Sequence, residues 1–256
     1  MPSEVEAFKS LAQCSDRIAR GYLTRNEWNL NQALNDYYDT QRHDDSEKAV
    51  QSYPLELHEL FAQYSCATNA EPLIDSEGLI NFISDLGYEI EDMATICLAK
   101  FLDCHRLTDG IIEAQFCRAW QLEGCTTIIK MRKVLQKLDH KLHTDIDYLE
   151  MIYNYTFDLV LDPGAKTLST DMALQYWTPF FSSGSYPVTV EDQLYQSWLD
   201  FIQQEQSISK DSWKMLLQFF KRFPDLITVK EHYNEADAWP YVIDEFYEYL
   251  GDIGKI

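Results

Sequence analysis

The sequence predicts an all-α protein of two parts, a small three-helix bundle followed by a larger helical domain. Apolar residues recur at intervals of three and four through most of the 256 residues, strand-like alternation is nearly absent, and a polar stretch separates the parts. Hydrophobic residues make up 46% of the chain, which is ample for a packed core. We expect the bundle over residues 3–40, a linker over 41–52 and the larger domain over 53–256.

The first part, 3–40, contains the start signals of short helices. Ser3 with Glu6 has the spacing of a capping box, and Asn29 is placed to cap the third helix. We expect the side chain of Trp28 to fill the small core. About 40 residues is near the lower limit for folding without metals or disulfides, so most apolar positions here must be structural.

The second part begins near Pro54 and consists of successive helical patterns joined by short connections. Thr189 and Ser209 are expected N-caps, and Pro240 suits the start of the final helix, where its missing N–H is not needed. The helices are expected over 55–64, 76–86, 91–102, 113–121, 127–138, 144–161, 169–181, 190–204, 210–223 and 240–250.

Two segments of the larger domain, 58–86 and 94–121, have the helix–loop–helix layout of paired EF-hands. Calcium requires oxygen ligands at alternate loop positions, a turn glycine and a terminal glutamate. With Glu77 or Glu113 as the last ligand, cysteine, alanine and leucine stand where acidic groups should be. We therefore expect an EF-hand-like scaffold without calcium ligands, and we predict no metal site and no cofactor.

The charge of the chain restricts its partners. With 21 basic and 42 acidic residues, the formal net charge is -21, which repels phosphate backbones and anionic lipid. We expect no nucleic acid and no membrane among the partners, and no segment reaches the roughly 18 consecutive apolar residues of a membrane span. The charge favours basic protein partners.

The sequence offers no recognisable catalytic constellation. The six cysteines form no CxxC pair, and we expect them to be reduced. Cys104 and His105 are the nearest thiol and base, but adjacent residues on a helix point in different directions. The chain is therefore expected not to be an enzyme with its own chemistry, and a ligase that carries a modifier as a thioester remains a weaker alternative.

The last quarter of the chain predicts a docking surface. Asp211 lies in a first helical turn, where a carboxylate gains from the helix dipole, and Asp244 lies one turn into the final helix. Ala238 precedes a Trp–Pro pair at the entry to that helix. Residues 231–256 hold seven acidic residues against one lysine, a local formal charge of -6. An acidic surface beside small and aromatic residues suits a basic partner.

The whole chain resembles the fungal defective-in-cullin-neddylation proteins. Residues 7–40, with the motif over 22–38, are similar to the family's N-terminal ubiquitin-associated domain. Residues from about 53 onward, including 152–157, 175–177 and the C-terminal residues above, are similar to its potentiating-neddylation domain. The resemblance implies a scaffold-type ligase component in the cytoplasm and nucleus. Such a protein promotes attachment of the ubiquitin-like neddylation modifier to a cullin and has no catalytic residues of its own.

The resemblance also implies two binding sites for partner proteins. In the family, an Asp, Ala, Asp patch grips the cullin's C-terminal winged-helix domain, and the matching residues are Asp211, Ala238 and Asp244. A hydrophobic pocket takes the N-acetylated methionine of the neddylation-conjugating enzyme, and a RING subunit completes the ligase. The matching pocket residues are Thr95, Leu98, Ala99, Leu102, Phe116, Leu159 and Tyr176.

The ubiquitin-associated part departs from its family's pattern. Where a Met-Gly-Phe-like loop normally contacts ubiquitin, this chain has Ala12, Gln13 and Cys14. The resemblance implies ubiquitin binding through Ala12 and Cys14, weakened or shifted toward Asp36 and Tyr37. A different function also fits: a ubiquitin-binding adaptor or shuttle, in which the first domain does the work and the second binds a client.

Overall fold

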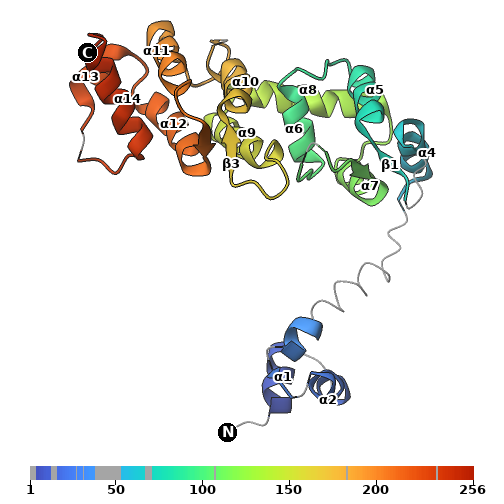
Figure 1. Ribbon diagram of the computed structural model, residues 1–256. Helices are drawn as coiled ribbons and strands as arrows, with labels where there is room; N and C mark the ends of the chain where they lie inside the picture. Colours follow the sequence, from blue (N-terminus) through green and yellow to red (C-terminus); the bar gives the residue numbers. More distant parts are fainter. Residues whose placement is uncertain are drawn as a thin grey trace. The chain divides into compact units, whose positions relative to one another are not determined.

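The computed structural model divides the chain into two compact units, residues 1–52 and 53–256, which are described separately. Both units are built mainly of α-helices, as the sequence predicts (Figure 1). No described helix is both long enough and apolar enough to cross a membrane. The structure describes residues 4–12, 16–26, 28–30, 32–37, 53–66, 71–106, 108–182, 184–234 and 236–256.

The first unit contains α1 (Glu4–Ala12) and α2 (Asp16–Arg25), followed by helical residues at 30 and 32–37. The side chain of Asn29 accepts a hydrogen bond from the backbone N–H of Gln32 at 3.2 Å, so the predicted cap of the third helix is confirmed. The buried core of this unit is small, in keeping with its length. Among the residues that the structure describes, its buried members are Val5, Phe8, Ala19, Leu23 and Ala33.

Trp28 does not fill this core, so that prediction is wrong. The residue is 45% exposed and has a φ of 59°, in the left-handed region that residues other than glycine seldom adopt. Its backbone N–H donates to the carbonyl of Leu23 at 2.7 Å, which closes the turn after α2. The turn, rather than the hydrophobicity of the indole, decides where this side chain points.

The first half of the second unit has the predicted EF-hand-like layout. Its elements are α4 (Leu55–Tyr64), β1 (Leu73–Ile74), α5 (Ser76–Leu86), α6 (Ala94–Phe101), β2 (Ile111–Ile112) and α7 (Glu113–Leu122). The two loops are joined by an antiparallel ladder in which Leu73 pairs with Ile112 and Ile74 with Ile111. Each helix–loop–helix therefore braces the other through its loop.

Helices α4 and α5 pack unusually closely at one point. A Cβ on Gly78 would lie 1.9 Å from the carbonyl oxygen of Tyr64, so only glycine fits there. The N-cap of α5, Asp75, accepts from the backbone N–H of Gly78 at 3.0 Å, and this fixes the start of the helix.

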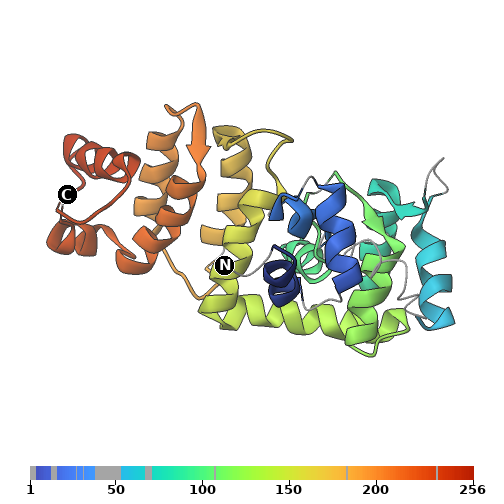
Figure 2. The same ribbon diagram turned by 90° about the horizontal axis from the view of Figure 1, so that it is seen from below.

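The second half of this unit repeats the layout. It contains α8 (Ile128–Thr144), α9 (Ile146–Leu159), β3 (Thr167–Ser169), α10 (Thr170–Phe181), α11 (Asp192–Ile202), β4 (Ser207–Ser209), α12 (Lys210–Arg222), α13 (Leu226–His232) and α14 (Tyr241–Asp252). Strands β3 and β4 pair antiparallel, with Leu168 opposite Ile208. Asp145 ends α8 and caps α9, and Figure 2 shows the sharp change of direction between these helices.

A cluster of buried aromatic side chains holds this second half together. Tyr153 is fully buried, donates its hydroxyl proton to the carbonyl of Trp213 at 2.8 Å and accepts from the indole N–H of Trp177 at 2.9 Å. Its ring stacks on that of Trp213 with centroids 4.7 Å apart. One tyrosine thus joins α9, α10 and α12, and burial raises its pKa well above the ordinary value, so it remains a neutral donor.

Three details of the second unit differ from the sequence predictions. Helix α13 begins with a capping box of Asp225 and Thr228. It was not predicted, because its seven residues are too few to show a helical period. The short strands are likewise too brief to show alternation. The N-cap of α11 is Glu191 rather than Thr189, whereas the predicted cap Ser209 is confirmed, accepting from Ser212 N–H at 3.0 Å.

Candidate protein-binding sites

A cavity of about 360 Å³ lies between α5, α6, α9 and α10. Most of its lining is apolar, and the acidic side chains of Glu91 and Asp92 belong to its lining on the turn before α6. The volume falls at the lower end of the range for sites that bind small molecules or short peptide segments. Its lining residues are Leu79, Ile83, Ile90, Glu91, Asp92, Met93, Thr95, Ile96, Leu98, Ala99, Leu102, Cys104, Ile111, Leu159, Gln175, Tyr176 and Pro179.

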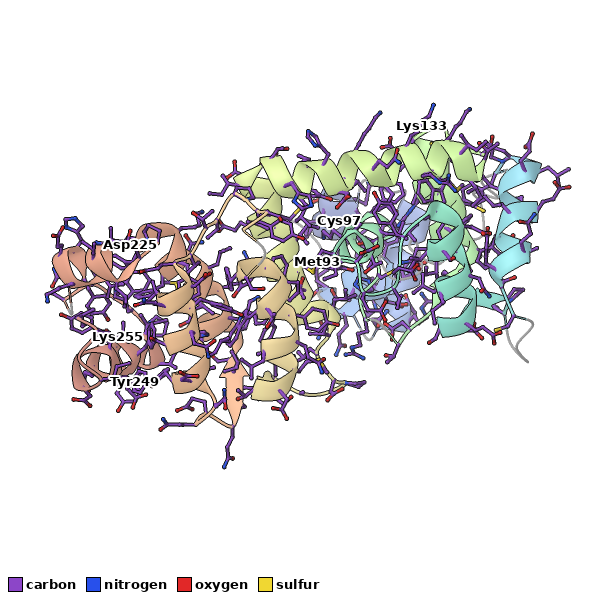
Figure 3. The ribbon with its side chains drawn as sticks, turned by 90° about the horizontal axis from the view of Figure 1, so that it is seen from above. Met93, Cys97, Lys133, Asp225, Tyr249 and Lys255 are labelled. Atoms are coloured by element: carbon purple, nitrogen blue, oxygen red, sulfur yellow. The ribbon has the colours of Figure 1, made fainter. Side chains whose placement is uncertain are left out.

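Helix α6 supplies one wall because its residues are spaced to share a face. Thr95, Leu98, Ala99 and Leu102 follow one another at intervals of three, one and three, and all four line the cavity. Figure 3 labels Met93, which precedes α6, and Cys97 within the helix, in the central part of this unit, whereas Lys133 extends outward from α8. The pattern of small and apolar side chains leaves open space beside the helix.

The hydroxyl of Thr95 closes the turn that forms the rim. It donates to the carbonyl oxygens of Asp92 at 2.7 Å and Ile90 at 3.2 Å. The polar group of this residue is thereby satisfied within the protein, so it adds no unpaired donor to the cavity.

Six of the seven residues assigned to a pocket from the sequence line this cavity: Thr95, Leu98, Ala99, Leu102, Leu159 and Tyr176. Phe116 does not, and its assignment is corrected here. It is fully buried and packs against Phe61 at 5.7 Å and Phe82 at 5.4 Å between ring centroids. Phe116 belongs to the core between α4, α5 and α7, behind the wall rather than on it.

The remaining lining residues were missed in the sequence because they come from four separated segments. Ile90 carried a usable signal in the sequence, since it is a large apolar residue beside two acidic ones, and the structure leaves it 41% exposed. Pro179 carried another. It lies inside α10 and has no N–H, so the carbonyl of Gln175 receives no helical hydrogen bond from it, and both residues face the cavity.

The three residues predicted to bind cullin lie on α12, on α14 and on the turn before α14. Asp211 is in the first turn of α12 and is exposed, and Ala238 is exposed in the turn. Asp244 is in the first turn of α14 and half-buried, where its carboxylate accepts a short hydrogen bond from the hydroxyl of Tyr233. Each of the three therefore reaches the surface of the second unit.

The residues on either side of Ala238 hold the turn in place. Asp237 forms an ion pair with Arg222 at the end of α12, with 2.8 Å between Nη1 and Oδ2. Trp239 packs edge-on against Phe219 at 5.9 Å, and Phe219 also packs against Phe246 of α14. These supporting contacts cannot be predicted from local spacing, because Arg222 precedes Asp237 by fifteen residues.

In the first unit, the residues predicted to contact ubiquitin take part in internal contacts. Asp36 accepts from Arg25 at 2.8 Å and from the amide of Asn26 at 2.7 Å. The Tyr37 hydroxyl donates to the carbonyl of Ala12 at 3.4 Å. These residues are half-buried, and Cys14 lies outside the described residues. The contacts of Ala12, Asp36 and Tyr37 therefore stabilise the first unit itself.

The five described cysteines are free thiols with raised pKa values. Burial raises the pKa of Cys104 to about 11, with smaller contributions from Asp103 and Asp109. Burial also raises the pKa of Cys97 to about 12. A nucleophilic cysteine needs the opposite shift, so these thiols are poorly suited to carry a thioester.

A family model described as a UBA-like domain matches residues 3–44, and one described as cullin binding matches residues 130–249. The fold and these matches define a class: an all-helical cullin-binding protein with an N-terminal ubiquitin-associated-like domain.

The relatives define the family. Defective in cullin neddylation protein 1 of Saccharomyces cerevisiae is 43% identical over 255 residues, which cover 97% of this chain and 93% of the relative. The protein of the same name from Candida glabrata is 43% identical over 259 residues, with 96% and 94% covered. DCN1-like protein 3 of Drosophila melanogaster is 26% identical over 196 residues, with 75% and 55% covered. The chain belongs to the defective-in-cullin-neddylation family.

Proposed function

We propose that this protein promotes cullin neddylation by holding a cullin and the neddylation-conjugating enzyme together. One observation supports this above the others: a well-formed apolar cavity and an exposed acidic surface lie in different parts of the same unit. The cavity is built on α5, α6, α9 and α10, and the acidic surface on α12 and α14 (Figure 1). Two partners can therefore be bound at once.

The cavity suits an acetylated N-terminal methionine of the conjugating enzyme. A methionine side chain is flexible and apolar, and it matches a lining that includes Leu98, Leu102 and Leu159. A free α-amino group among these leucines would bring a positive charge into the apolar part of the lining, away from Glu91 and Asp92 on the turn before α6, and burial of an unpaired charge is costly. Acetylation removes that charge, so an acetyl group should increase affinity.

The acidic surface suits a basic face of the cullin's C-terminal winged-helix domain. Asp211 and Asp244 supply carboxylates. Ala238, which lies between them in the sequence, has a small side chain that lets the partner approach closely. Complementary charge at such a surface raises the association rate and fixes orientation. The match of residues 130–249 to a cullin-binding family supports the choice of partner.

Acceleration by this protein would come from proximity rather than from side-chain chemistry. Holding the enzyme and the cullin in one complex raises the effective concentration of the thioester near the acceptor lysine. The reactive cysteine belongs to the conjugating enzyme, and a RING subunit is expected to complete the assembly. The raised pKa values of the described cysteines support a role without catalysis.

Peptide titration tests the cavity. An N-acetylated peptide from the start of the conjugating enzyme and the same peptide with a free amine are titrated into the full chain by calorimetry. We expect the acetylated peptide to bind at least roughly tenfold more tightly, because it buries no ammonium. Equal affinities of the two peptides would contradict the proposal that the cavity binds the acetylated N-terminus of the conjugating enzyme.

A mixing experiment tests tethering itself. Ala99→Arg fills the cavity, and Ala238→Arg places a cation on the cullin-binding surface. We expect each variant to lose the acceleration of cullin neddylation, and a mixture of the two to remain inactive, because no single molecule then holds both partners. Recovery of the rate in the mixture would show that the sites work independently.

Deletion of residues 1–40 separates this function from that of a ubiquitin-binding adaptor. On our proposal the second unit keeps most of the acceleration without them. If the deletion abolishes activity while Asp211→Ala with Ala238→Arg and Asp244→Ala leaves it unchanged, the adaptor function should be adopted instead.

A further inference from the structure

A mixed cluster of metal-binding side chains lies at the contact between α4 and α7, and none of its three residues lines the cavity or belongs to the predicted cullin-binding surface. His58 lies on α4, and Glu113 and Cys117 lie on α7. The imidazole Nδ1 of His58 is 2.7 Å from Oε1 of Glu113. One nitrogen, one carboxylate oxygen and the thiol sulfur all lie within 4.8 Å of one another.

The helices themselves bring these three groups together. Glu113 and Cys117 are four residues apart, so they share one face of α7, one turn above each other. Helix α4 packs against that helix through the ring contact of Phe61 and Phe116, with centroids 5.7 Å apart, and His58 is three residues before Phe61 on α4. The convergence is therefore held by core packing rather than by flexible loops.

Burial distinguishes this cluster from an ordinary surface group of acids. Cys117 is fully buried, while His58 and Glu113 are half-buried. Tyr53 lies alongside, with its ring centroid 6.0 Å from that of His58 and its hydroxyl donating to the carbonyl of Ala114 at 3.3 Å. The thiol faces the protein interior and the other two groups face solvent, so an ion could enter from one side.

We propose that His58, Glu113 and Cys117 form a site for a divalent transition-metal ion of the zinc type, which ties α4 to α7. Imidazole, carboxylate and thiolate are the three ligand types that zinc takes in proteins, and three protein ligands leave a fourth position for water. A tetrahedral zinc site separates its ligand atoms by roughly 3.3–3.6 Å, from metal–ligand distances of about 2.0–2.3 Å. The present separations, 2.7 Å between nitrogen and oxygen and at most 4.8 Å for any pair, lie on either side of these values.

The electrostatics of the cluster favour a cation. Burial and, to a smaller extent, the negative charge of Glu113 together raise the pKa of Cys117 to about 11, so the thiol is protonated when no metal is bound. A divalent ion reverses both effects, because it attracts the thiolate and the carboxylate together. As the sulfur–metal bond forms, the thiol proton passes to solvent.

Cobalt and zinc titrations of the full chain test this site. Cobalt(II) bound by a thiolate gives a sulfur-to-metal charge-transfer band, which reports Cys117 directly. Zinc should raise the melting temperature by roughly 5–10 °C at a concentration about 100 times its Kd. Cys117→Ala should lose both the charge-transfer band and the zinc-dependent melting shift. His58→Gln should bind either metal at least roughly tenfold more weakly than wild type.

Matched controls come from the same part of the chain. Cys66→Ala removes a less buried thiol and His105→Gln an exposed imidazole, and neither should change the band or the zinc-dependent melting shift. Should wild type and Cys117→Ala show the same band and the same shift, the site does not exist. The result is independent of neddylation activity, since neither readout requires cullin or the conjugating enzyme.

Discussion

The cavity on α6 and the acidic surface of α12 and α14 differ in how they can hold a partner. The cavity is preformed, concave and mainly apolar, so its affinity should come from burial and should depend little on salt. The acidic surface carries the exposed Asp211 and the half-buried Asp244, so its strength should depend on ionic strength and on the position of a few carboxylates. One unit thus uses two kinds of recognition, and each can be weakened without the other.

The largest expected effect is at the acidic surface. Ala238→Arg should weaken cullin binding by roughly 100-fold or more, because a bulky cation then occupies a small exposed position that faces a basic partner. Affinity is measured by biolayer interferometry with the cullin C-terminal domain. Ala114→Arg, an exposed alanine on α7, is the matched control and should bind normally. Retained binding in Ala238→Arg would place the cullin contact elsewhere.

A similar loss is expected in the cavity. Ala99→Arg should weaken binding of the acetylated peptide by about 100-fold, because the long side chain fills the space beside α6. Cullin binding by the same variant should remain within about twofold of wild type. Peptide calorimetry and cullin interferometry on one protein preparation give both values. A parallel loss of cullin binding would mean that the two regions are coupled.

Salt should change the affinity for cullin more than the affinity for the peptide, although by less than the substitutions above. Raising sodium chloride from about 50 mM to about 500 mM should weaken cullin binding by roughly tenfold, since screening acts on exposed charges. Peptide binding in the cavity should change by less than about twofold. If both affinities fall equally, the peptide contact is electrostatic and the contrast between the regions fails.

A smaller effect is expected where one carboxylate is positioned by a neighbour. Tyr233→Phe removes the hydroxyl that donates to Asp244, and it should reduce cullin affinity by roughly three- to tenfold. The ring and its packing remain, so thermal stability serves as the control. An affinity equal to that of wild type would show that the partner alone orients this carboxylate.

The smallest effect on binding is expected from the core that lies between the regions. Tyr153→Phe removes the hydroxyl shared by Trp177 and Trp213, and should lower the free energy of unfolding by about 1–3 kcal/mol. Urea unfolding measures this. Both affinities should stay within about twofold below the unfolding transition, and a larger change would show that this hydrogen bond transmits strain between the sites.

The sequence was sufficient for features that depend on neighbours along the chain. Ser209 was recognised as a cap because a hydroxyl before a helix satisfies a free N–H three residues on. The four residues on α6 were assigned to a pocket through the family resemblance, and helical spacing is consistent with that assignment because it places them on one face. In contrast, Phe116 was misplaced because an apolar residue on a helix does not show from its spacing which neighbouring helix it meets.

Contacts between distant segments could not be predicted from spacing. Strands β3 and β4 have three residues each and lie forty residues apart in the sequence. They are too short to show a regular alternation of apolar and polar residues, so their pairing could not be predicted. His58 and Glu113 are separated by 55 positions, and only the packing of α4 on α7 brings them together. The same reason accounts for the lining contributed by Gln175 and Pro179.

By itself, the amino-acid order determined the all-helical class, the capped helix starts such as Ser209, the acidic C-terminal region and the resemblance that leads to the family. The helical class, the caps and the acidic region follow from periodicity, from hydrogen bonds within one turn and from charge counts, whereas the resemblance rests on matching stretches of sequence; none of these requires knowledge of tertiary contacts. Tertiary structure decided which apolar faces became core and which became cavity. It also decided where Trp28 points and which side chains converge at α4 and α7. Such choices depend on how separate helices pack, because burial is a property of the assembled surfaces rather than of any one segment.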